Sequence, residues 1–130
     1  MNLNIPINHT YEIDLIVEKK HTALAYGSGL AEVFATPAMV AFMENAAYKS
    51  IEPFLPEGHS TVGMEINVKH LKATLPGKKL VAKSKVTAVD GRKISFEIKV
   101  YEGEHLAGNC THDRFLINNE KFIAKLNQQT

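Results

Sequence analysis

The feature that most constrains the fold is one long helix that is apolar over about half of its surface. Residues 33–48 read VFATPAMVAFMENAAY. Thr36 is a favoured N-cap residue, and Pro37 is tolerated at the first helical position. Pro53 ends the helix, because proline disfavours helical geometry at the residue before it. These signals predict a helix of about 16 residues, roughly 24 Å long.

The apolar side chains of this helix form a broad arc when residues are placed 100° apart. The arc contains Met39, Val40, Phe42, Met43, Ala46, Ala47 and Ile51. Asn45 and Lys49 lie opposite, and Glu44 lies at the edge of the arc. An apolar arc close to 180° wide can be buried only if a sheet curves around the helix.

Five segments supply the strands of such a sheet. Apolar and polar residues alternate in segments 10–18, 61–70, 80–88 and 94–100, and segment 105–118 alternates less regularly, so its inward face stays open. Residues 22–33 have no clean period and are expected to form a loop or flap. The predicted fold class is α+β, with a curved antiparallel sheet of about five strands wrapped around one long central helix. This is the plan of a hotdog fold.

Composition excludes several classes of partner. A chain of 130 residues fits a single domain over 1–130, and 15 basic against 14 acidic side chains give no field that favours nucleic acid or a membrane surface. No apolar stretch approaches the roughly 18 residues of a membrane span. The single cysteine, Cys110, and a start without signal-peptide character lead us to expect a cytoplasmic protein.

Three side chains are candidates for chemistry rather than packing. His70 is in phase with Val62, Met64, Ile66 and Val68 on the strand face expected to pack on the helix. Glu44 and Thr36 are expected to face the same space, and a hydroxyl, an imidazole and a carboxylate near a helix N-terminus suit acyl transfer. Each also has a purely structural interpretation: Thr36 as the N-cap, Glu44 as a boundary carboxylate, and His70 as a hydrogen-bonded core histidine.

His112 and Arg114 are two residues apart in segment 105–118 and therefore share one face. Arg114 either binds a substrate carboxylate or phosphate, or forms a structural ion pair with Glu44 or Asp113. No histidine or cysteine spacing indicates a metal site, and no cofactor is expected.

The chain resembles the fluoroacetyl-CoA thioesterase-like family of hotdog thioesterases. The resemblance lies in VFATPAMVAFMENAA, VGMEINVKHLKATLPG, GRKISFEIKVYEG, GNCTHDRFLIN and EKFIAKL, in the family's order and spacing, over about residues 10–126. It implies a homodimer, with active sites at the subunit interface, that hydrolyses a short-chain acyl-CoA thioester to the free acid and CoA. The alternative is a hotdog module that binds acyl-CoA without catalysis, as a sensor or carrier.

The resemblance also assigns roles to residues. Thr36, Glu44 and His70 fall on the family's catalytic positions, and whether Thr36, Glu44 or a water attacks stays open. The substrate-binding candidates are Gly63, Arg114, Leu30 and Phe34, and Lys69 and Lys72 are candidates for a rim that binds the CoA phosphates. In the flap, Gly27 and Leu30 stand where the fluoroacetyl-specific enzyme has a phenylalanine-bearing lid, so a different acyl preference is expected.

Overall fold

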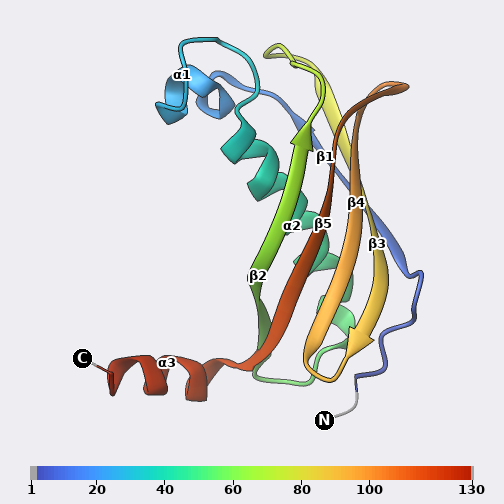
Figure 1. The fold of residues 1–130 in the computed structure, drawn as a ribbon, viewed down its shortest axis with the longest axis vertical. Coiled ribbons are helices and arrows are strands. Elements are labelled where there is room, and N and C mark those ends of the chain that lie inside the picture. The colour runs from blue at the N-terminus through green and yellow to red at the C-terminus, as the bar shows by residue number, and fades with distance from the viewer. Residues whose placement is uncertain (1–2, 130) are drawn as a thin grey trace.

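A five-stranded antiparallel sheet curves around one long helix in the computed structural model, which describes residues 3–129 (Figure 1). The strands are β1 (Thr10–Ile16), β2 (His59–His70), β3 (Lys79–Asp90), β4 (Lys93–Glu102) and β5 (His105–Asn118). Their order in the sheet is β1-β3-β4-β5-β2, and every neighbouring pair is antiparallel. The predicted α+β plan is confirmed, and β1 and β2 form the two edges.

The central helix α2 (Thr36–Ile51) lies along one face of this sheet (Figure 1). Its buried residues are Ala38, Met39, Phe42, Met43, Ala46, Ala47, Ser50 and Ile51. Every second residue of the middle strands packs against them. In β4 these residues are Ile94, Phe96, Ile98 and Val100, and all four are buried. The predicted inward face of β4 is therefore confirmed.

The remaining elements are short. They are the 3-10 helices η1 (Lys19–His21) and η2 (Glu52–Phe54) and the helices α1 (Ala23–Tyr26) and α3 (Asn119–Asn127). The segment expected to be a loop thus contains one helical turn, which Thr22 caps through its hydroxyl and Gly27 ends at a φ of 73°. Figure 1 shows α1 above the N-terminal end of α2, and α3 pointing away from the sheet at the opposite end. No helix within residues 3–129 is long and apolar enough to cross a membrane.

A β-bulge in β2 changes which of its side chains face the helix. Gly63 pairs with Arg114 and Glu65 with Asp113, so Met64 is an extra residue without a partner on β5. The predicted single face is therefore wrong in its first half. Val62 pairs with the exposed Phe115 on the outer side of the sheet, and Met64 is 56% exposed. Beyond the bulge the prediction holds, because Ile66 and Val68 pack against the core.

The structure also determines the inward face of β5, which the sequence left open. Cys110, His112, Arg114 and Leu116 are all buried, and they alternate with more exposed neighbours. Two polar side chains of β5, His112 and Arg114, therefore lie on the face of the sheet that packs against α2. Such a placement is costly unless their hydrogen bonds are satisfied.

Candidate active site

Thr36 and His70 form a hydrogen-bonded pair where α2 begins and β2 ends. The distance between Thr36 Oγ1 and His70 Nδ1 is 2.9 Å. The N-cap of α2 is Ala35, so the prediction that Thr36 caps the helix is wrong. Thr36 is the first helical residue, and its hydroxyl contacts the imidazole instead of a backbone N–H group of the first turn.

The surroundings of His70 favour the neutral form of its imidazole. Desolvation on burial lowers its pKa below the ordinary 6.5, and a contact with the backbone of Lys72 acts in the opposite direction. His70 Nε2 is buried and has no hydrogen-bond partner among the described residues. The edge of the Phe34 ring faces the imidazole, with centroids 6.4 Å apart. A neutral imidazole beside a hydroxyl is a candidate general base.

A cavity of about 370 Å³ opens beside this pair. It is lined by Ala23, Ser28, Val33, Phe34, Ala35, Thr36, Pro37, His70, Leu71, Lys72 and Ala73. Its volume falls in the range of small-molecule sites. Of the two substrate-binding candidates near the flap, Phe34 lines the cavity, whereas Leu30 does not and is 89% exposed.

The two candidate phosphate-binding lysines lie in different places. Lys72 lines the cavity, but its ammonium group is 2.8 Å from a carboxylate oxygen of Glu102 and lowers the pKa of that carboxyl. Lys69 lines a separate hollow together with Lys99 and Asn109. Only Lys72 therefore lies beside the Thr36–His70 pair, and it is already engaged in an ion pair.

Glu44 and Arg114 form a second group farther along α2. Arg114 Nη1 lies 3.6 Å from Glu44 Oε2, and the arginine side chain is 9% exposed against 39% for the glutamate. Arg114 is held by Thr61, whose hydroxyl accepts a hydrogen bond from Nε at 2.8 Å and whose carbonyl accepts one from Nη2 at 2.9 Å. The sequence left the ion-pair partner of Arg114 open between Glu44 and Asp113, and in the structure the partner is Glu44.

Gly63 allows this second group to form. A Cβ atom at Gly63 would lie 2.7 Å from Glu44 Oε2 and 3.5 Å from Arg114 Nη1. Any side chain at this position would displace the carboxylate. The absence of a side chain at Gly63 therefore lets the Glu44 carboxylate lie against the backbone of β2.

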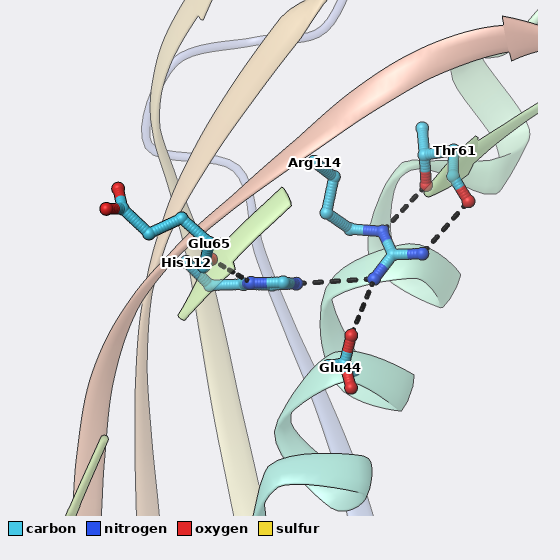
Figure 2. Close-up of polar contacts among 5 residues, drawn as sticks. All are labelled: Glu44, Thr61, Glu65, His112 and Arg114. Carbon is cyan, nitrogen blue, oxygen red and sulfur yellow. Dashed lines mark hydrogen bonds and ion pairs between the residues drawn. The ribbon is translucent and has the colours of Figure 1, made fainter. Parts of the chain in front are cut away.

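His112 completes the second group, and the sequence did not predict this role (Figure 2). Its Nδ1 lies 2.8 Å from the carbonyl oxygen of Glu65, and its Nε2 lies 3.2 Å from Arg114 Nη1. The ring stacks on Phe96, with centroids 6.0 Å apart. Its position two residues from Arg114 on one face was the only available signal.

Within one chain the predicted catalytic residues are divided between two groups. Eight residues separate Thr36 from Glu44, which corresponds to about 12 Å along the helix axis. Seven residues of β2 separate Gly63 from His70, roughly 23 Å along an extended strand. The structure brings Thr36 to His70 and Glu44 to Arg114, and it keeps these two pairs apart.

Comparisons with known proteins converge on one family. The sequence model described as fluoroacetyl-CoA-specific thioesterase matches residues 17–120. The fluoroacetyl-CoA thioesterase of Streptantibioticus cattleyicolor is 38% identical over 99 residues, which cover 76% of this chain and 71% of that protein.

Solved structures agree with this result. A solved structure of the fluoroacetyl-CoA thioesterase FlK superposes with a TM-score of 0.92 at 32% identity, covering 98% of each chain. A thioesterase superfamily member from Thermus thermophilus gives a TM-score of 0.89 at 25% identity, over 96% of this chain and 93% of that one. A hot-dog-like protein from Thermanaerovibrio acidaminovorans, 18% identical with a TM-score of 0.88 over 95% and 92% of the two chains, supports the fold alone. The predicted hotdog fold is confirmed.

Proposed function

The chain belongs to the fluoroacetyl-CoA-specific thioesterase family, and from this premise we propose that it hydrolyses a short-chain acyl-CoA thioester to the free acid and CoA. The observation that carries the proposal is the hydrogen bond of 2.9 Å between Thr36 Oγ1 and His70 Nδ1 beside a cavity of about 370 Å³. A hydroxyl in contact with a neutral imidazole is an activated nucleophile.

In the proposed reaction, His70 takes the proton of the Thr36 hydroxyl as Oγ1 attacks the thioester carbonyl carbon. The C–S bond then breaks, the CoA sulfur leaves with the proton from the imidazole, and the acyl group remains on Thr36. Water activated by the same imidazole hydrolyses this ester and releases the acid. The N-terminus of α2 carries a partial positive charge that stabilises the oxyanion of both steps.

The protein is proposed to act as a homodimer in which two copies of β2 pair edge to edge. β2 is 12 residues long and lies at the edge of the sheet. An open edge of this length favours strand pairing, and pairing about a two-fold axis closes a dimer. An axis midway between Gly63 and His70 would bring the partner's Glu44–Arg114 pair against the Thr36–His70 pair. Such a dimer reunites the three predicted catalytic residues at the subunit interface.

We further propose a short acyl group other than fluoroacetyl as the preferred substrate. The lid position occupied by Leu30 is exposed and does not line the cavity, so it supplies no aromatic wall around the acyl carbon. Loss of such a wall changes substrate choice more than the hydrolytic step. The location we propose is the cytoplasm, which is consistent with a single cysteine, Cys110, buried and unpaired.

The test is a panel of acetyl-, fluoroacetyl-, propionyl- and butyryl-CoA, assayed by thiol release. The wild-type protein is expected to turn over at least one member, with little preference for fluoroacetyl-CoA over acetyl-CoA. His70→Ala should lose about 10²- to 10⁴-fold in kcat/KM. His105→Ala, which removes an exposed histidine at the start of β5, is the matched control. No turnover across the panel, or an unimpaired His70→Ala variant, refutes the proposal.

A further inference from the structure

The imidazole of His112 is a buried titratable group that the proposed reaction does not use. It is 2% exposed, yet both of its ring nitrogens have partners. One nitrogen contacts a backbone carbonyl of β2, and the other contacts Arg114 (Figure 2). The ring therefore links the ion pair with Glu44 to the backbone of the edge strand.

The two partners determine the tautomer and the charge of the ring. A carbonyl oxygen only accepts, so His112 Nδ1 carries the proton and donates it to Glu65 O at 2.8 Å. A guanidinium group only donates, so Nε2 must be unprotonated to accept from Arg114 Nη1 at 3.2 Å. The ring is thus neutral. The pKa of His112 is lowered first by desolvation and then by the charge of Arg114, and the backbone of Glu65 and the carboxylates of Glu44 and Asp113 oppose the shift.

The contacts of His112 and Arg114 enclose the β-bulge from both sides. The register shift falls between Gly63 and Glu65. Arg114 holds the backbone carbonyl of Thr61 before the bulge, and His112 holds the carbonyl of Glu65 after it. A bulge interrupts the ladder of backbone hydrogen bonds, and here two side chains of β5 bond to carbonyls of β2 on either side of it. The position of Gly63, against which Glu44 lies, is fixed between these two contacts.

We infer that His112 is a positioning residue for thioester hydrolysis, which holds the Arg114 guanidinium and the bulge of β2 so that Glu44 and Gly63 keep their places at the site. The inference rests on the proposed function. Arg114 Nη1 contacts two acceptors: His112 Nε2 at 3.2 Å and Glu44 Oε2 at 3.6 Å. Without the acceptor on His112, the guanidinium group is free to close on the carboxylate and turn it away from the substrate.

Two substitutions separate this role from simple packing. His112→Phe keeps a ring that stacks on Phe96 and loses both hydrogen bonds, whereas His112→Gln places an amide oxygen where it can accept from Arg114. We expect His112→Phe to lower kcat about 10- to 100-fold, the cost of a misplaced catalytic group, with KM changed much less. His112→Gln should recover a large part of the loss. His105→Phe, at an exposed position, is the matched control.

An NMR measurement tests the tautomer without relying on turnover. The ¹⁵N shifts of His112 in the wild-type protein should be those of a neutral ring protonated on Nδ1 at pH 7. A charged ring, a proton on Nε2, or a His112→Phe variant with wild-type kcat would overturn the inference while leaving the proposed function intact. Failure of the wild-type protein on every acyl-CoA would overturn both. If His112→Phe does not fold, the kcat of His112→Gln and the tautomer still decide.

Discussion

The hydroxyl of Thr36 is available for chemistry because another residue caps the helix. Ala35 occupies the N-cap and offers no side-chain acceptor to the first turn. A good capping side chain stabilises a helix by about 1 kcal/mol. The chain forgoes this stabilisation and instead directs the Thr36 hydroxyl at the imidazole of His70. At this residue, the hydroxyl contacts the imidazole instead of capping the helix, as the proposed role of Thr36 as nucleophile requires.

The pH dependence of the reaction follows from the direction of the His70 pKa shift. The imidazole must be neutral to accept a proton, and burial lowers its pKa below 6.5. Activity should therefore persist at pH 6.5 and fall only at lower pH, as the ring becomes protonated. The measurement is kcat/KM for the best acyl-CoA between pH 4.5 and 8.

The acid limb of this profile has a second contributor. Protonation of His112 would remove the acceptor that holds Arg114, and burial lowers the pKa of His112 as well. Both groups act in the same direction, so the profile of His112→Gln, in which this position no longer titrates, isolates the contribution of His70. An acid limb with an apparent pKa above 6.5 in both proteins would contradict the role of a half-buried, neutral His70.

The site residues differed in how far the sequence could specify them. Thr36 and His70 could be selected because helix signals and strand alternation place both at one end of the helix–sheet interface. The partner of Arg114 could not, because choosing Glu44 over Asp113 depends on how the curved sheet packs against α2. His112 was grouped with Arg114 by its spacing, but its bond to Glu65 depends on a bulge in another strand.

The bulge in β2 shows, at the level of the element, where alternation fails as a guide. Counting every second residue placed Val62 and Met64 with Ile66, Val68 and His70. The extra residue at Met64 shifts the phase by one, so Gly63 and not Val62 faces α2. A period of two holds only while each residue has one partner on the next strand. The strand was therefore predicted correctly, and its first half was assigned to the wrong face.

The packing of α2 on β5 leads to a prediction about stability. A Cβ atom at Gly108 would overlap the thioether of Met39, with its Cε at 2.9 Å, and would lie 3.0 Å from the backbone oxygen of Lys69. Neither the buried methionine nor the neighbouring strand can move away freely. Gly108→Ala should lower the free energy of unfolding by about 1–3 kcal/mol, the usual cost of overpacking. Urea denaturation measures the change.

The matched control for this substitution is Gly29→Ala in the flap. Its new methyl group would meet Ala23 Cβ at 3.6 Å, an ordinary van der Waals distance. The unfolding free energy should change by no more than about 0.5 kcal/mol. Equal stability of the Gly108→Ala variant and the wild-type protein would mean that α2 is not pressed against β5 at this point.

At the scale of the whole molecule, the two edges of the sheet differ in what they carry. β1 pairs with β3 and has no catalytic candidate among its described residues. β2 carries Gly63 in its first half and His70 at its last residue, so the two parts of the predicted site lie at different points along one strand. A single chain keeps Thr36 and Glu44, one from each half, about 12 Å apart along the helix axis. Two copies paired antiparallel along β2, as proposed, would place complementary halves together twice, and activity would then depend on assembly.

This dependence can be tested by placing one charge on each edge. Met64 in β2 is 56% exposed and Tyr11 in β1 is 39% exposed. Met64→Lys should disfavour pairing of two β2 edges, because two lysines would be brought to one interface. We expect the wild-type protein to scatter light as a dimer of 14.4 kDa chains, and Met64→Lys to shift towards the monomer and lose activity. Its remaining activity per chain should rise with protein concentration as dimers re-form.

Tyr11→Lys is the control and should remain dimeric and active. A monomeric wild-type protein with full activity would show that one chain holds a complete site, and Glu44 would then have no part in the reaction at His70.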